Sequence, residues 1–60
     1  MNMNEQELRN YETLKRNVEL SGGRFVKEYR AYEGDYRVIV EYPNKHQARY
    51  TVSGEHAGQM

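Results

Sequence analysis

The spacing of apolar residues changes once along the chain, near residue 22, from a helical period to a strand period. In the first third, Leu8, Tyr11, Leu14 and Val18 recur at intervals of three, three and four, which places them on one face of an α-helix. Charged side chains recur on the opposite face, namely Glu5, Arg9, Glu12, Arg16 and Glu19. This pattern predicts an amphipathic helix with one face available for packing.

Both ends of this helix carry sequence signals. Asn4 is a favourable N-cap, and Glu7 stands three residues later, as a capping box requires. At the other end, Ser21, Gly22 and Gly23 follow the last helical position. Glycine adopts the left-handed conformation that ends many helices, so we expect the helix to stop there.

After the helix, apolar and polar residues alternate with a period of two. Segments 24–32, 36–42 and 48–53 are rich in Val, Ile, Tyr, Phe and Thr, which are typical strand residues. The separating segments 33–35 and 43–46 contain Gly, Pro, Asn and Asp, which favour tight turns. Short connections between successive strands indicate an antiparallel meander.

The sequence therefore predicts an α+β fold, with a single N-terminal helix packed on one face of a three-stranded antiparallel meander sheet (α-β-β-β, order 1-2-3). Residues 1–53 form a single domain in this prediction. Residues 54–60 contain two glycines and no periodicity, so they are expected to form a flexible C-terminal tail.

Alternation also predicts which side chains face the helix. In the second and third strands these are Tyr36, Val38, Val40, Tyr42, Ala48, Tyr50 and Val52. The side chains between them then point away from the helix, and we call this uncovered side of the sheet the open face. Ile39 is the one large apolar residue of the second strand on that face.

The facing of the first strand depends on its turn. If Ala31 pairs with Tyr36 across a two-residue turn at 33–34, the first strand contributes Phe25, Lys27, Tyr29 and Ala31 to the helix-facing side. A shift by one residue would instead turn Glu28 and Arg30 toward the core. Because burying two charged residues is unfavourable, the first register is the one we predict.

In that register the open face contains a surface suited to a partner. Glu41 and Arg49 become cross-strand neighbours, whereas Arg30 and Arg37 stand opposite each other, an unfavourable arrangement that an anion or a partner's carboxylate would offset. Ile39 adds an apolar centre, and arginine and tyrosine are enriched at interface hot spots. The candidate partner-binding residues are Val26, Arg30, Tyr32, Arg37, Ile39 and Arg49.

The composition narrows the remaining options. Sixty residues bury little surface, so small domains of this kind often need further stabilisation. Cysteine is absent and the two histidines, His46 and His56, are ten positions apart, which excludes disulfides and fits no zinc pattern. Association with another chain is then the expected source of extra stability.

Catalytic patterns are missing from the sequence. No serine or threonine sits in a nucleophile motif, and no pair of carboxylates or set of metal ligands converges in the predicted fold. A domain of this size also has little room for a pocket that excludes water. We therefore expect a protein that is not an enzyme and that uses neither a cofactor nor a metal.

The charge balance argues against nucleic-acid and membrane partners. Nine basic and nine acidic residues generate no strong field toward nucleic acid or anionic lipid. No apolar run reaches the ~20 residues of a membrane span, and no signal-peptide pattern is present, so no membrane partner and a cytoplasmic location are expected.

The preferred interpretation is a small protein-binding module, of the kind found among bacterial and phage accessory regulators or inhibitors, that acts through the open face. The first alternative is a nucleic-acid binder that uses Arg24, Arg30, Arg37 and Arg49. Against it, Tyr32 is the one tyrosine predicted to point outward from the sheet, and base stacking needs two or three such aromatic residues. The second alternative is a homodimerising structural protein.

Overall fold

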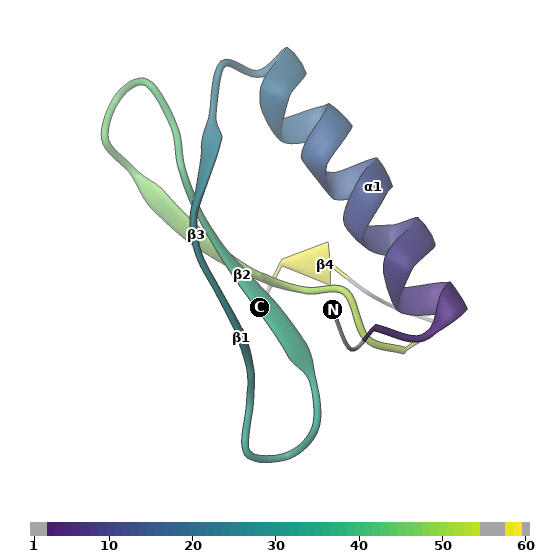
Figure 1. The fold of residues 1–60 in the computed structure, drawn as a ribbon. Coiled ribbons are helices and arrows are strands. Elements are labelled where there is room, and N and C mark those ends of the chain that lie inside the picture. Colours follow the sequence, from purple (N-terminus) through teal and green to yellow (C-terminus); the bar gives the residue numbers. More distant parts are fainter. Residues whose placement is uncertain (1–2, 55–57, 60) are drawn as a thin grey trace.

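The computed structural model describes residues 3–54 and 58–59. Its elements follow the order α1 (Glu5–Leu20), β1 (Arg24–Arg30), β2 (Tyr36–Glu41), β3 (Gln47–Thr51) and β4 (Gly58–Gln59). The first three strands form an antiparallel meander, and α1 lies along one side of it (Figure 1). The predicted α-β-β-β fold with strand order 1-2-3 is therefore confirmed.

The short strand β4 is an addition to the expected sheet. It pairs antiparallel with Tyr50 and Thr51 at the outer edge of β3, giving the strand order β1-β2-β3-β4. It belongs to the segment for which the sequence predicts a flexible tail. Residues 55–57 and 60 of that segment lie outside the described residues, so the prediction of a flexible tail remains a prediction.

The helix ends are formed by the residues that the sequence indicated. The side chain of Asn4 accepts a hydrogen bond of 2.7 Å from the backbone N–H of Glu7, and the Glu7 carboxylate accepts one of 3.0 Å from the backbone N–H of Asn4. This capping box satisfies two N–H groups that helix geometry leaves free. At the C-terminal end, Gly22 takes a left-handed φ of +80° and ends the helix.

The hydrophobic core lies between α1 and the sheet. Val18, Val38 and Val40 are buried and form its centre. Partly buried side chains pack around this centre, namely Tyr11, Leu14, Phe25, Tyr36, Tyr42 and Tyr50. The predicted alternation of β2 and β3 is thus confirmed, whereas Leu8 on the predicted apolar stripe of α1 is 40% exposed.

The hairpin between β1 and β2 has a loop of three residues, Tyr32, Glu33 and Gly34. The backbone N–H of Ala31 donates to the carbonyl oxygen of Asp35 at 2.7 Å, and that of Gly34 donates to the carbonyl oxygen of Ala31 at 2.9 Å. Gly34 closes the loop with a φ of +105°, a conformation typical of the last position in such loops. The prediction of a two-residue turn is therefore wrong, because the loop is one residue longer.

The longer loop reverses the facing of most of β1. Arg30 pairs with Tyr36 and Glu28 pairs with Val38, so Glu28 and Arg30 point toward the helix. Lys27 pairs with Ile39, and it lies on the open face. Tyr29 pairs with Arg37 on the same face. The prediction that Lys27 and Tyr29 face the helix, and that Arg30 stands opposite Arg37, is wrong.

A β-bulge returns the first part of β1 to the expected facing. The register shifts between Phe25 and Lys27, so Val26 is the extra residue. Phe25 consequently pairs with Val40 on the helix side. Its ring packs edge-on against Tyr11 of α1, with ring centroids 5.3 Å apart, and this contact is an aromatic geometry that stabilises a core.

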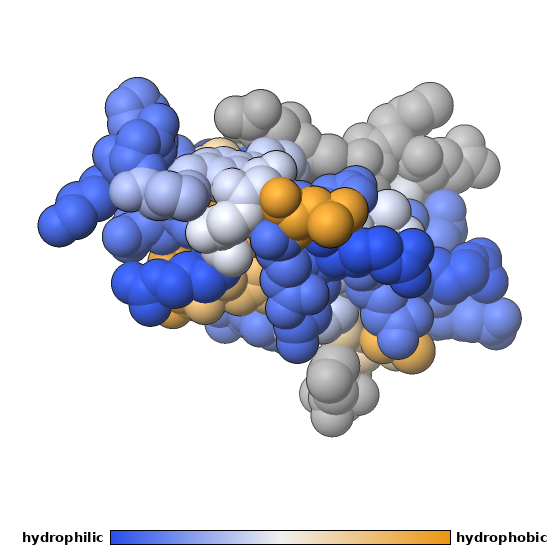
Figure 2. All heavy atoms as spheres, turned by 90° about the horizontal axis from the view of Figure 1, so that it is seen from above, coloured by the Kyte–Doolittle hydropathy of each residue, from blue (hydrophilic) through white to orange (hydrophobic). Residues whose placement is uncertain are grey.

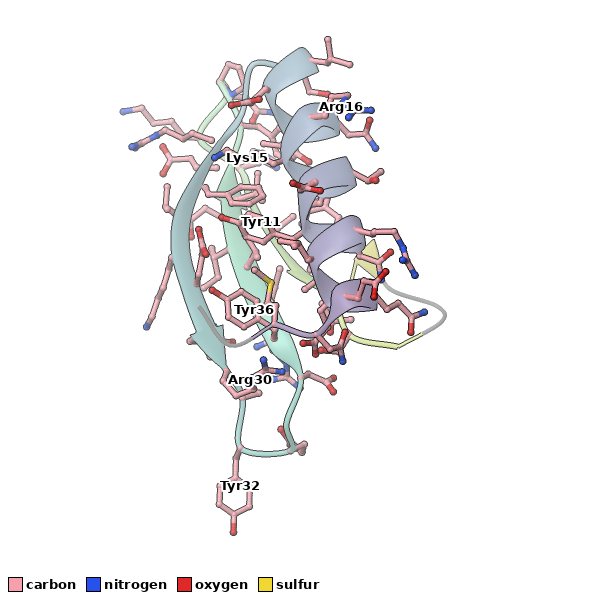
Figure 3. All side chains as sticks on the ribbon, turned by 45° about the vertical axis from the view of Figure 1, so that its right-hand side comes forward. Tyr11, Lys15, Arg16, Arg30, Tyr32 and Tyr36 are labelled. Carbon is pink, nitrogen blue, oxygen red and sulfur yellow. The ribbon has the colours of Figure 1, made fainter. Side chains whose placement is uncertain are left out.

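The two charged residues on the helix side are satisfied by partners that the sequence pattern does not reveal. The Glu28 carboxylate accepts hydrogen bonds from the hydroxyls of Tyr11 at 2.8 Å and Tyr36 at 2.9 Å. The Arg30 guanidinium forms an ion pair of 2.9 Å with Glu7. Figure 3 shows Tyr11, Tyr36 and Arg30 in the space between α1 and the sheet. Because these charges are paired, the register that seemed unfavourable is the one adopted.

The second hairpin also has a three-residue loop, which comprises residues 43–45. The N–H of Tyr42 donates to the carbonyl oxygen of His46 at 2.9 Å, and that of Lys45 donates to the carbonyl oxygen of Tyr42 at 2.8 Å. Arg49 therefore pairs with Ile39 rather than with Glu41, which pairs with Gln47. The predicted Glu41–Arg49 partnership is wrong by two positions, and a shift of two leaves the facing of β3 unchanged.

Candidate functional site

The open face of the sheet is the candidate site. It consists of nine side chains in three cross-strand rows, as the pairing of β1, β2 and β3 defines them. The rows are Arg24, Glu41 and Gln47; Lys27, Ile39 and Arg49; and Tyr29, Arg37 and Thr51. Four of these nine residues are basic and one is acidic, so the face has an excess of positive charge that the whole chain lacks.

The middle row has an apolar centre between two cations. Ile39 lies on the central strand and is partly buried, while Lys27 and Arg49 on either side of it are exposed. Ile39 alternates with Val38 and Val40, which are fully buried under α1, so the position of Ile39 on the open face agrees with the prediction.

Two bases of the open face have acidic partners within the chain. Arg24 lies 3.8 Å from the carboxylate of Glu41. The guanidinium of Arg37 lies 3.6 Å from Glu33 and 4.0 Å from Asp35, and its side chain is only 17% exposed. These pairs reduce the charge that either arginine presents to a partner.

The bases of the middle row have no acidic partner in the described part of the chain. Lys27 places its ammonium 5.6 Å from the centroid of the Tyr29 ring, a cation–π contact that leaves its charge uncompensated. The Arg49 side chain makes no hydrogen bond or ion pair with the other residues that the structure describes. The uncompensated positive charge of the open face is therefore concentrated at Lys27 and Arg49, on both sides of Ile39.

The six predicted site residues do not form one cluster. Arg37, Ile39 and Arg49 lie on the open face, and Val26 forms the bulge at its edge with 38% of its surface exposed. Tyr32 is fully exposed in the hairpin loop, where it points away from the molecule beyond the ends of β1 and β2 (Figure 3). Arg30 is on the opposite side, facing α1.

Two residues of the open face, Lys27 and Tyr29, are not among those predicted from the sequence. Their positions follow from the loop length, because a three-residue loop that ends in glycine moves the β1 register by one position relative to a two-residue turn. Gly34 was the available signal, since a glycine at the third loop position is typical of this hairpin type.

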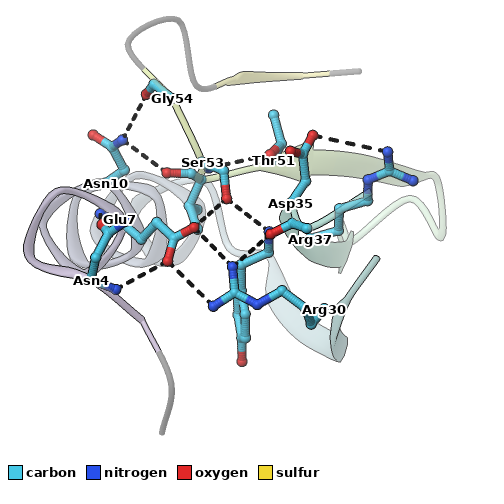
Figure 4. Close-up of polar contacts among 12 residues, drawn as sticks. Asn4, Glu7, Asn10, Arg30, Asp35, Arg37, Thr51, Ser53 and Gly54 are labelled. Carbon is cyan, nitrogen blue, oxygen red and sulfur yellow. Dashed lines mark hydrogen bonds and ion pairs between the residues drawn. The ribbon is translucent and has the colours of Figure 1, made fainter. Parts of the chain in front are cut away.

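A polar cluster on the helix side, made of Asn4, Glu7, Arg30 and Ser53, connects three parts of the chain (Figure 4). Glu7 is buried and receives hydrogen bonds from the Arg30 guanidinium, the Ser53 hydroxyl and the Asn4 backbone. These donors, the Arg30 bond foremost, lower the pKa of Glu7 from 4.5 to about 2. Ser53 also accepts a 2.8 Å bond from the Tyr36 backbone N–H. Each oxygen of the Glu7 carboxylate thus accepts two hydrogen bonds from within the chain, so the cluster holds together the segments that contribute to it.

A shallow groove of about 250 Å³ lies between α1 and β3. It is lined by Asn10, Thr13, Leu14, Asn17, Tyr50, Thr51 and Val52. Asn10 already donates to the carbonyl oxygen of Val52 at 2.9 Å, and the groove contains no ionisable group other than Tyr50. A hydrogen bond between its hydroxyl and that of Tyr42, together with burial, raises the pKa of Tyr50. Nothing in this lining resembles a catalytic arrangement.

Two further findings concern metals and membranes. In the part of the chain that the structure describes, no three His, Cys, Asp or Glu side chains come together in a way that would hold a metal ion. Among the same residues, no helix has the length and apolar character needed to cross a bilayer. The surface seen along one end of the molecule is mainly hydrophilic, with small separate hydrophobic patches (Figure 2).

Comparison with known proteins finds no protein-family model, no curated protein and no solved structure that matches this chain.

Proposed function

We propose that this protein is a small non-enzymatic binding module that docks on a partner protein through the open face of its sheet. The observation that carries the proposal is the middle row of that face, in which Ile39 is flanked by Lys27 and Arg49. An apolar centre with a charged rim is the usual arrangement of a protein interface. A regulatory or inhibitory role in the cytoplasm is the corresponding biological proposal.

The open face leaves both apolar surface and positive charge uncovered. A solvent-exposed β-sheet face normally carries polar side chains that are paired with one another across the strands. Here the row centred on Ile39 instead leaves two like charges without a counter-charge in the described residues. A partner that covers Ile39 would remove apolar surface from water and neutralise both cations in one contact.

The proposal is tested by affinity capture from the native cell, with the wild-type chain compared with Ile39→Asp. We expect Ile39→Asp to lose the partner that the wild type retains, because a carboxylate would replace the apolar centre of the contact. Leu20→Asp is the matched control, since Leu20 is 81% exposed on the last turn of α1 and lies away from the open face. A partner retained equally by all three chains would refute a role for the open face.

A nucleic-acid binder remains the second candidate, because the observed register places four bases on the open face and turns Tyr29 outward. Two contacts weaken it. Arg24 and Arg37 are paired with acidic side chains, so fewer cations are available to phosphates. The Tyr29 ring is in contact with the Lys27 ammonium, and a stacking base would have to displace it.

A further inference from the structure

We infer that the partner segment recognised by the open face is an extended, acidic segment with one apolar side chain between two carboxylates. This inference rests on the proposed function and specifies the chemistry of the partner. The apolar side chain would lie on Ile39, and the carboxylates would pair with Lys27 and Arg49.

The geometry of the middle row sets the spacing of these groups. Lys27, Ile39 and Arg49 belong to three adjacent strands, and neighbouring strands lie about 4.8 Å apart. The backbone positions of the two cations are therefore about 10 Å apart, with the apolar side chain midway between them. In an extended segment, alternate residues share one face at intervals of about 7 Å. An acidic, apolar and acidic residue at alternate positions spans about 14 Å, a distance that the long Lys27 and Arg49 side chains can accommodate.

The neighbouring rows restrict what else can bind. Arg24 with Glu41, and Arg37 with Glu33 and Asp35, form pairs on both sides of the middle row. A partner with positive charge would meet the uncompensated Lys27 and Arg49 and be repelled. A second copy of this chain, apposed through the same face, would bring the same two cations against each other, so self-association through this row is disfavoured.

The occupant is a polypeptide rather than a polyphosphate because of the apolar centre. A nucleic acid gains its affinity from many phosphate contacts, whereas this face offers two uncompensated cations separated by an isoleucine. In a polypeptide of this kind, the two carboxylates would pair with Lys27 and Arg49, and the apolar side chain would cover Ile39.

The test uses the full chain and fluorescein-labelled synthetic peptides, with binding followed by fluorescence anisotropy at low ionic strength. The main probe contains a leucine with glutamates two positions before and after it, and neutral residues elsewhere. We expect Lys27→Glu/Arg49→Glu to weaken binding at least about tenfold, because two attractive pairs become repulsive. The same double variant should bind a peptide in which lysines replace both glutamates, and this reversal is the result that a general loss of folding cannot produce.

Lys15→Glu/Arg16→Glu is the matched control, because both residues are exposed on α1 and the double change alters the formal charge by the same amount. It should retain binding of the glutamate peptide. The inference is overturned if the wild type does not bind this peptide, or if a peptide with glycine in place of leucine binds equally well. Equal or tighter binding of a labelled single-stranded oligonucleotide would overturn it in favour of nucleic acid.

The two proposals fail in different ways. If Lys27→Glu/Arg49→Glu still captures a partner that Ile39→Asp loses, the open face binds a protein but does not recognise acidic groups. If no captured partner depends on Ile39, the proposed function itself is wrong.

Discussion

Glu7 connects three segments that are distant from one another in the sequence. The sequence identifies it as the N3 residue of a capping box, whose side chain bonds to the backbone of the N-cap residue. In the structure its side chain is 7% exposed and bonded to Arg30 of β1, and its second partner, Ser53, follows β3. One carboxylate therefore fixes the start of α1, the end of β1 and the segment that follows β3.

The depressed pKa of Glu7 predicts a dependence of stability on pH. Because the folded pKa of about 2 lies below the ordinary value of 4.5, the carboxylate stabilises the fold above pH 4.5. This contribution, on the order of 2–3 kcal/mol after allowance for the partly exposed Arg30, is lost as the pH falls from about 4.5 to about 2. We expect Glu7→Gln to lose it at neutral pH and to be less sensitive to acid than the wild type.

The measurement is thermal unfolding followed by far-ultraviolet circular dichroism at pH 7, 4 and 2.5. A difference of 2 kcal/mol should lower the midpoint of Glu7→Gln by roughly 10 °C at pH 7, and the difference between the two proteins should be much smaller at pH 2.5. Glu5→Gln is the control, since Glu5 is in the same helical turn but forms only an exposed pair with Arg9. Parallel pH profiles of wild type and Glu7→Gln would contradict the assignment.

At the scale of the elements, the two hairpins share one loop geometry but fill its last position differently. In both loops the third residue has a positive φ, which is +105° at Gly34 and +68° at Lys45. This conformation is unstrained for glycine and costs about 1 kcal/mol for a residue with a Cβ atom. The β2–β3 loop therefore contains a small backbone strain that the β1–β2 loop avoids.

This difference predicts opposite effects of two substitutions. Lys45→Gly should raise the free energy of unfolding by up to about 1 kcal/mol, and Gly34→Ala should lower it by a similar amount. Urea unfolding followed by circular dichroism measures both, with Lys45→Ala as the control for loss of the lysine side chain. Should Gly34→Ala prove as stable as the wild type, the positive φ at position 34 would not be what favours glycine there.

The elements also show which parts of the fold can be predicted from the sequence. The helix is predicted because its caps and its apolar stripe are local signals, and β2 keeps its facing because Val38 and Val40 alternate whatever their partners are. The facing of β1 depends on one residue of loop length, and the charges of Glu28 and Arg30 favour the register that the structure does not adopt. Their partners, Tyr11 and Glu7, lie 17 and 23 positions away in the chain, where no local pattern connects them.

The same dependence on register decides which residues of the candidate site can be predicted from the sequence. Ile39 was identified because it lies on β2, whose alternation is local, and Arg49 because a shift of two positions preserves its side of the sheet. Lys27 was missed because its side depends on the β1 register. A binding surface that crosses several strands can be predicted only as well as its least certain strand.

For the whole molecule, the distribution of charge predicts the oligomeric state. The chain is neutral overall, yet the open face has an excess of basic residues, with two of its cations lacking an acidic partner in the described residues. A face-to-face dimer would bring these cations together. We therefore expect a monomer of 7.2 kDa in size-exclusion chromatography with light scattering, at concentrations up to about 1 mM in low salt. A dimer that persists there and dissociates in Ile39→Asp would support the homodimer instead.

The bulge at Val26 divides β1 into halves whose side chains alternate out of phase. Before it, position 25 is directed at α1, and after it positions 28 and 30 are. In a saturation mutagenesis experiment, positions that tolerate polar substitutions should alternate along this strand with positions that do not, and this alternation should be interrupted once, at position 26. Deletion of Val26 would either expose Phe25 to water or move Glu28 away from the two tyrosines that donate hydrogen bonds to it. The number of residues in β1 at this point, more than their composition, therefore decides which side of the sheet is apolar.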